Sequence, residues 1–235
     1  AAVAAVHTAL ARIEVGEQPT SPRNLAEALG TLRPPMRQAD RAIDWQRDST
    51  DLVLRKLRAA DGTPGVADEV LGLPVHCYDA HPEEALRGTA GEIIAQCDGA
   101  ICRATRDGAV WITHLKDSHD PARPFKLPAA MVLGERLRAV PTERLAVDAP
   151  HAARTWREIY YEEHEDVGVL HFPFYNGAMS TAQCERLTAA YREATRRPTK
   201  AIVLAGGPDF WSNGIHLNVI EASSQPAEES WRNIN

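Results

Sequence analysis

The sequence lacks several features that mark specialised classes of protein. No apolar run approaches the roughly 20 residues of a membrane-spanning helix, so no membrane association is predicted. The opening segment, AAVAAVHTALARIEVGE, has no Met, no basic stretch and no cleavage site, and is therefore not a signal peptide. The 4 cysteines are irregularly spaced, which argues against a disulfide framework and favours a reducing cytoplasm.

Familiar site motifs are missing as well. The sequence contains no P-loop, no G-x-G-x-x-G and no G-x-S-x-G nucleophile motif. Cys97 and Cys102 have several His residues nearby in the sequence, but without the spacing of a zinc site, so they are interpreted as structural Cys and surface His and no metal is predicted. The net charge of −6 argues against nucleic-acid binding, as do the 9 Lys and Arg against 14 Asp and Glu of residues 41–120.

What is present, 44% apolar and 25% charged residues, is typical of a globular protein. Residues 1–15 predict an amphipathic helix that ends at Gly16, and the proline-containing residues 17–40 predict a linker. Residues 41–117 predict one helix, to about Ala60, and short strands with Asp-Gly hairpin turns. One helix and about five short strands favour a small open barrel of the OB type.

A second linker, residues 118–155, is predicted from its prolines, with a short helix near residues 130–140. Residues 156–235 then predict a hairpin, a helix with a Ser180/Gln183 capping box, and a buried strand at 201–205. The buried face expected for this helix is Cys184, Leu187, Tyr191 and Ala194. The chain begins within a helical pattern and stops at Asn235 without a sign of a domain end, so we expect a fragment of a longer protein.

The loop after residue 205 is the most informative stretch. It contains Gly206-Gly207-Pro208 and then Gly214, between a buried strand and a possible helix. Free backbone N–H groups in such a loop can bind a phosphate or a developing oxyanion. The alternative is a tight turn that simply needs glycine at positive φ.

Residues 22–117 resemble the tail of a formyltetrahydrofolate-dependent formyltransferase. The resemblance rests on Ala42-Ile43-Asp44-Trp45, on Arg58-Ala59 with Pro64-Gly65, and on Gly91-Glu92-Ile93 followed by Asp98-Gly99. Residues 1–16 resemble the last helix of the same family's folate-binding catalytic domain. The family's catalytic Asn, His and Asp lie further upstream, so the resemblance implies that formyltetrahydrofolate is bound upstream of these residues.

Residues 156–235 resemble the start of a crotonase (enoyl-CoA hydratase/isomerase) domain. The family loop F-x-x-G-x-D-L aligns with WSNGIHL, residues 211–217, in which His216 replaces the usual Asp. The resemblance implies that the backbone N–H of Ile215 is half of an oxyanion hole for an acyl-CoA thioester. It further implies roles for Gly214 in the backbone turn and for Ser212, Asn213 and His216 in a coenzyme A loop.

A formyltransferase tail joined to a crotonase start resembles the HypX (HoxX) family of hydrogenase maturation factors. The resemblance implies an α+β, α/β multidomain chain and a bifunctional cytoplasmic enzyme. This enzyme would move a formyl group from formyltetrahydrofolate to coenzyme A and release CO from formyl-CoA for [NiFe]-hydrogenase, with maturation proteins as possible partners. The alternatives are an enoyl-CoA hydratase or isomerase, a formyltransferase alone, or a non-catalytic connector between two active sites.

Overall fold

The computed structural model describes residues 2–18, 31, 33–144, 146–148 and 155–235. They divide into two compact units, Ala1–Met36 and Arg37–Asn235. Parts of both predicted linkers, residues 19–30, 32, 145 and 149–154, lie outside the described residues. Within the described residues, no helix combines the length and the apolar character that crossing a membrane requires.

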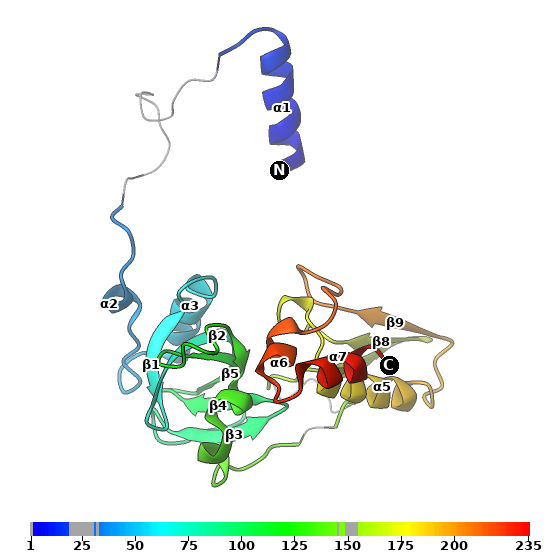
Figure 1. The fold of residues 1–235 in the computed structure, drawn as a ribbon. Helices are drawn as coiled ribbons and strands as arrows, with labels where there is room; N and C mark the ends of the chain where they lie inside the picture. Colours follow the sequence, from blue (N-terminus) through cyan, green and yellow to red (C-terminus); the bar gives the residue numbers. More distant parts are fainter. Residues whose placement is uncertain (1, 19–30, 32, 145, 149–154) are drawn as a thin grey trace. The chain divides into compact units, whose positions relative to one another are not determined.

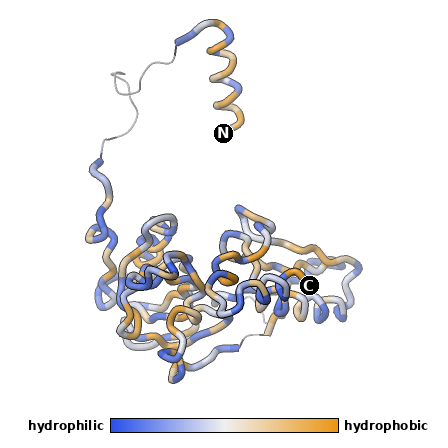
Figure 2. Tube along the Cα trace, viewed as in Figure 1, coloured by the Kyte–Doolittle hydropathy of each residue, from blue (hydrophilic) through white to orange (hydrophobic). Residues whose placement is uncertain are grey.

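The first unit contains one helix, α1 (Ala2–Glu14), which confirms the predicted element. Gly16, at a φ of 77°, donates to the Ile13 carbonyl and ends the helix, because glycine tolerates this conformation. Polar and apolar residues alternate along α1 (Figure 2), and the apolar ones are 52–72% exposed at Val3, Val6, Leu10 and Ile13. The amphipathic pattern is therefore present, but its apolar side chains are not buried within this unit.

The second unit starts with two helices and a six-stranded sheet (Figure 1). The elements are α2 (Gln38–Arg41), α3 (Thr50–Ala59), β1 (Val66–Val70), β2 (Leu73–Glu83), β3 (Ile93–Cys97), β4 (Ala100–Ala104), β5 (Ala109–Asp117) and β6 (Leu127–Pro128). The strand order is β1-β2-β5-β4-β3, all antiparallel, and β6 pairs with β5. The predicted Asp98-Gly99 turn between β3 and β4 is confirmed, with φ of 47° and 89° at the two residues.

The predicted open barrel is confirmed only as an open sheet, because the described strands do not close into a barrel. β1 and β3 are its two ends and do not pair with each other. The free edge of β3 is bonded instead by a later segment, since Gln96 accepts from the Glu143 N–H and donates to the Pro141 carbonyl. The edge of β1 is bonded by the Gln38 side chain, which contacts the Ala67 N–H and the Gly65 carbonyl. Both edge strands of the open sheet therefore find hydrogen-bond partners outside the sheet.

One face of this sheet is covered by α3, whose N-cap Ser49 accepts from the Leu52 N–H. The core beneath the helix includes Trp45, Leu57 and Ile112, all buried. β2 reaches 11 residues because it continues past an irregular residue. Asp79 has a φ of 52°, and its N–H donates to the Asp61 carboxylate instead of to a neighbouring strand.

The rest of the unit contains α4 and a 3₁₀ turn, which pack on the first sheet, followed by a smaller sheet and its helices (Figure 1). The elements are α4 (Ala129–Leu133), a 3₁₀ turn (Gly134–Leu137), β7 (Tyr160–His164), β8 (Val167–His171), α5 (Thr181–Ala194), β9 (Ala201–Ala205), α6 (Leu217–Ala222) and α7 (Pro226–Ile234). β7 and β8 form the predicted hairpin, and β9 lies parallel to β8. The predicted capping box of α5 is confirmed, because Ser180 and Gln183 bond each other's backbone N–H.

Two predictions for this region were wrong, the first only in part. The buried residues of α5 are Thr181, Gln183, Ala190 and Ala194, of which Ala194 was predicted, and the predicted Leu187 packs on the same core, whereas Tyr191 is 44% exposed. β9 is not a buried strand, since it is the sheet edge and Val203 is 48% exposed despite the apolar character seen in Figure 2. The predicted β-β-α-β unit is present once, as β7, β8, α5 and β9, and the described residues build no complete crotonase spiral.

Candidate functional site

The loop after β9 is folded back on itself and fastened to the segment that precedes α5. The indole N–H of Trp211 donates to the Leu204 carbonyl over 2.9 Å. A Cβ on Gly206 would lie 2.5 Å from the Cα of Trp211, so only glycine permits this approach. Further along, the Asn213 N–H donates to the Gly177 carbonyl over 2.7 Å. The loop conformation is therefore fixed by its own backbone and by the 177–179 segment.

Residues 214–216 form a single parallel bridge with Met179. The Met179 N–H donates to the Gly214 carbonyl, and the His216 N–H donates to the Met179 carbonyl, both over 2.9 Å. In such a bridge the N–H of the central residue faces away from the partner strand. The Ile215 N–H accordingly has no hydrogen-bond partner among the described residues. An unpaired N–H beside a pocket meets the first requirement for an oxyanion donor, and that role stays a prediction.

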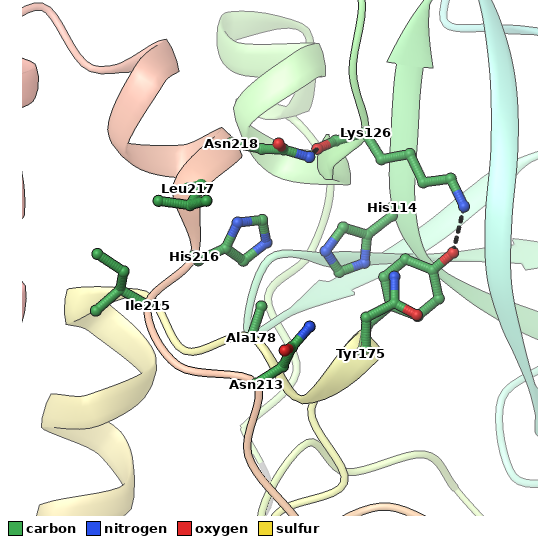
Figure 3. Close-up of a pocket in the computed structure, with 10 residues that line it drawn as sticks. His114, Lys126, Tyr175, Ala178, Asn213, Ile215, His216, Leu217 and Asn218 are labelled. Atoms are coloured by element: carbon green, nitrogen blue, oxygen red, sulfur yellow. Dashed lines mark hydrogen bonds between the residues drawn. The ribbon is translucent and has the colours of Figure 1, made fainter. Parts of the chain in front are cut away.

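The neighbouring predicted residues have structural partners within the loop. The Ser212 hydroxyl accepts a hydrogen bond from the Gly214 N–H over 3.1 Å. Gly214 has a φ of 81°, and a Cβ built on it would meet no atom within 4 Å. Glycine is thus required at this position by the backbone conformation and not by crowding in the described structure. Asn213 is exposed, and its side chain lines the pocket (Figure 3).

His216 anchors the loop in place of the Asp that the resemblance leads one to expect. It is the N-cap of α6, and its Nδ1 accepts from the Val219 N–H over 3.4 Å, the bond that an Asp carboxylate could make. Only 7% of its surface is exposed, and burial lowers the pKa of its imidazole. Its ring stacks on that of His114, with centroids 5.9 Å apart and 13° between the planes.

These loop residues form one wall of a pocket of about 270 Å³ (Figure 3). The opposite wall comes from the first sheet and supplies His114 of β5 and Lys126, which precedes β6. The complete lining is His114, Lys126, Tyr175, Asn176, Ala178, Asn213, Ile215, His216, Leu217 and Asn218. The pocket therefore lies between the two sheets and is built by segments about 100 residues apart in sequence.

Lys126 and Tyr175 are fixed together at one end of the pocket. The Lys126 ammonium donates to the Tyr175 hydroxyl and to the Asp61 carbonyl, each over 2.6 Å, and lies 4.1 Å from the centre of the Tyr78 ring. Burial lowers the pKa of Lys126, although Asp61 and Asp79 oppose this effect. Burial also raises the pKa of Tyr175, so its hydroxyl stays protonated.

His114 was wrongly assigned to the surface from the sequence, because only 5% of it is exposed. Its Nδ1 lies 2.7 Å from the Thr113 hydroxyl, which in turn donates to the Asp79 carboxylate. Burial would raise the pKa of Asp79, but hydrogen bonds from His81 and Thr113 lower it overall. The one available signal in the sequence was the mostly apolar run of residues 109–115, because a strand without polar alternation is buried on both faces.

Among the described residues no group of three or more His, Cys, Asp or Glu side chains could hold a metal ion. Cys97 and Cys102 lie buried beside Trp111 in a small apolar cluster. Burial raises the pKa of both thiols, Cys97 to about 12, so they remain protonated and structural.

Comparison with known proteins identifies the first sheet. The family described as "Formyl transferase, C-terminal domain" matches residues 35–125. The hydrogenase maturation factor HoxX of Bradyrhizobium diazoefficiens (strain USDA 110) is 49% identical over 234 residues. That alignment covers 100% of this chain and 40% of HoxX.

Solved structures agree with this assignment. The crystal structure of HypX from Aquifex aeolicus in complex with tetrahydrofolic acid is 46% identical and superposes with a TM-score of 0.92. It is matched over 100% of this chain and 40% of its own. A substituted variant of the same HypX also gives a TM-score of 0.92, over 42% of its chain. This chain thus spans less than half the length of the relatives it matches.

Proposed function

Because this chain belongs to the HypX/HoxX family of hydrogenase maturation factors, we propose that it is part of a bifunctional enzyme that makes CO for the active-site iron of [NiFe]-hydrogenase. One activity transfers a formyl group from formyltetrahydrofolate to coenzyme A. The other converts formyl-CoA to CO and coenzyme A. The observation that carries this proposal is the unpaired Ile215 N–H on a pocket that the formyltransferase C-terminal domain helps to form.

In the CO-releasing step, the formyl-CoA carbonyl oxygen accepts a hydrogen bond from the Ile215 N–H. The C–S bond of the thioester breaks, the formyl carbon loses its proton, and a proton is returned to the coenzyme A sulfur, so that the products are CO and the free thiol. The N–H stabilises negative charge on the carbonyl oxygen as the step proceeds. A positioned donor of this kind is typically worth about 3 kcal/mol of the barrier. Gly214, Ser212 and His216 hold the loop on either side of this donor.

In the proposed enzyme, different segments of this chain belong to different domains. Residues 1–16 form the last helix of the folate-binding catalytic domain, and residues 41–117 form the formyltransferase C-terminal domain. Residues 17–40 and 118–155 connect these parts, although the second range also supplies β6 and α4 to the first sheet, and residues 156–235 are the first part of a crotonase-like domain. Formyltetrahydrofolate then binds to the upstream catalytic domain, coenzyme A binds beside the 206–216 loop, and the enzyme works in the cytoplasm with other hydrogenase maturation proteins.

One observation favours a second, compatible role as a connector. The two sheets are joined by partly buried polar contacts, including the bond between Lys126 and Tyr175 and the ion pair between Arg186 and Asp98. Such contacts fix the geometry of the formyltransferase part relative to the loop. The segment would then keep the sites of formyl transfer and CO release in register.

The test replaces the backbone donor without changing a side chain. In the full-length protein, Ile215 is replaced by its α-hydroxy acid, which exchanges the N–H for an ester oxygen, and CO release from formyl-CoA is measured. We expect a loss of about 100-fold, the scale of a missing oxyanion donor. Ile215→Val, which keeps the N–H, serves as the control and should retain turnover within about 3-fold.

A second variant tests the turn itself. Gly214→Ala is expected to lower CO formation by tenfold or more, because φ at this residue is positive and Ala disfavours that conformation. Unchanged CO release in the ester-substituted protein would exclude the oxyanion role. Hydration of crotonyl-CoA by the wild-type protein, without CO from formyl-CoA, would favour the enoyl-CoA hydratase alternative.

A further inference from the structure

His114 presents an unsatisfied hydrogen-bonding atom to the pocket. The side chain is 5% exposed, and its Nε2 is buried with no hydrogen-bond partner among the described residues. Buried polar atoms are rarely left in this state, because an unmade bond costs free energy. Figure 3 shows the His114 and His216 rings facing each other across the pocket that Ile215 also lines.

The hydrogen bonds around His114 determine which kind of group its Nε2 can bind. The single hydroxyl proton of Thr113 is donated to the Asp79 carboxylate, which is ionised because its pKa is lowered. The Thr113 oxygen can therefore only accept from His114, and Nδ1 must carry the imidazole proton. Burial lowers the pKa of His114 to about 3, so the ring is neutral and Nε2 has a free lone pair. The unsatisfied atom is an acceptor.

The opposing His216 has the complementary tautomer. Its Nδ1 accepts from the Val219 N–H, which leaves the proton on Nε2. Together with the Ile215 N–H, the loop wall therefore offers donors, whereas His114 on the other wall offers an acceptor. A ligand that fits both walls has an acceptor at the loop and an N–H or O–H group directed at His114.

We propose that His114 is a substrate-contacting residue whose Nε2 accepts a hydrogen bond from an N–H or O–H group on the thiol arm of the coenzyme A thioester. This inference rests on the proposed function, which puts the thioester carbonyl at Ile215. The carbonyl itself has no proton to give, so it cannot satisfy His114. The arm next to the sulfur carries two secondary amides and one hydroxyl, and each of these supplies a donor. The formyltransferase C-terminal domain thereby contributes a specificity residue to the second reaction.

Ligand substitution tests the contact on the wild-type, full-length protein. Binding of coenzyme A is compared by titration calorimetry with three analogues. The first has the amide nearest the sulfur replaced by an ester, the second has the other amide replaced by an ester, and the third lacks the hydroxyl. Each analogue deletes one donor, so the arms of the experiment identify which group His114 contacts. One analogue should bind about 10-fold more weakly, and the other two should lose much less.

Two substitutions at one position connect that loss to His114. His114→Asn removes the acceptor at the Nε2 position, whereas the longer His114→Gln restores one. We expect His114→Asn to bind coenzyme A about 10-fold more weakly and to show no further loss with the critical analogue, with His114→Gln within about 3-fold of wild type. His119→Asn, at an exposed histidine, is the matched control.

The outcomes separate the two proposals. Equal analogue losses in wild type and His114→Asn overturn the contact while leaving the proposed function in place. Absence of coenzyme A binding to the wild-type protein overturns both. A loss that is common to His114→Asn and His114→Gln, and is independent of the analogue, shows a purely structural His114 and likewise overturns the contact.

Discussion

Lys126 and Tyr175 join the two sheets of residues 37–235 through a hydrogen bond of 2.6 Å. The same ammonium donates to the Asp61 carbonyl, while the Asn218 side chain of α6 donates to the Lys126 carbonyl over 3.0 Å. Lys126 thus contacts the end of α3, the segment before α5 and the helix after the candidate loop. Lys126, which immediately precedes β6, therefore contacts segments from both walls of the pocket.

Replacing Lys126 tests this connection. In Lys126→Met the aliphatic volume is largely kept, but the bonds to Tyr175 and Asp61 are lost. We expect the free energy of unfolding to fall by about 1–3 kcal/mol, because both acceptors lose a charged donor. Urea denaturation provides the measurement. Lys116→Met is the control, since Lys116 makes no hydrogen bond or ion pair with the described residues; an equal loss there would contradict the prediction.

Two loop glycines should respond differently to the same change. Gly177 and Gly214 both have positive φ, 65° and 81°. A Cβ on Gly177 would lie 2.6 Å from the Phe210 Cβ and 3.0 Å from the Asn213 nitrogen, whereas a Cβ on Gly214 meets nothing within 4 Å. Gly214→Ala should cost only backbone strain, about 1 kcal/mol.

Gly177→Ala adds a clash to the same strain and should cost at least about 2–3 kcal/mol more than the backbone term alone. Thermal denaturation of the two variants side by side checks the difference. If the two Ala variants have the same melting temperature, the 177–179 segment does not hold the loop in the way that the structure indicates.

Local signals in the sequence were sufficient for the individual elements of this fold. The Asp98-Gly99 turn and the Ser180/Gln183 capping box were predictable because a few adjacent residues determine each conformation. The face of α5 was predicted only in part, since Ala190 rather than Tyr191 becomes its core side once the helix packs on the small sheet. Propensity alone does not choose between such faces.

The residues of the candidate site also differ in whether the sequence alone could indicate them. Ile215 was predicted through a motif that is continuous in sequence, and the resemblance of that motif to a known loop carried the assignment. His114, Lys126 and Tyr175 come together only when two sheets pack, so no local pattern indicated them. The groups that bond the two edges of the first sheet were not predicted for the same reason, because Gln38 and the 141–143 segment reach those edges from a distance in sequence.

Arg186 provides a test of a buried charge pair. It forms ion pairs with Glu158 and with Asp98 of the β3–β4 turn, and Gln183 also donates to Glu158 over 2.6 Å. Burial raises the pKa of Glu158, and the Arg186 charge opposes that shift. Removing Arg186 would leave a buried carboxylate unpaired, which typically costs about 3–5 kcal/mol.

We therefore expect Arg186→Met to destabilise the protein strongly and Glu158→Gln/Arg186→Met to recover much of the loss, in urea denaturation at pH 7. Arg196→Met removes only an exposed ion pair with Glu193 and should cost no more than about 1 kcal/mol. A double variant that is less stable than Arg186→Met would show that the unpaired carboxylate is not the source of the cost.

The neutral state of His114 makes stability depend on pH. Its pKa is lowered from an ordinary value of 6.5 to about 3, first by burial and further by the charge of Lys126, although Asp79 opposes the shift. The unfolded chain therefore binds a proton between pH 6.5 and 3 that the folded chain does not. Stability from this group is fully present above pH 6.5 and is lost as the pH falls.

Between pH 7 and pH 5 the loss amounts to about 2 kcal/mol for one fully buried imidazole. Wild type should lose this much more stability over that interval than His114→Asn, which has no titrating group at the position. His119→Asn should follow the wild-type profile, because His119 is exposed in both the folded and unfolded chain. Urea denaturation at pH 7, 6 and 5 gives the three profiles, and parallel profiles for wild type and His114→Asn would mean that the folded protein protonates His114 readily.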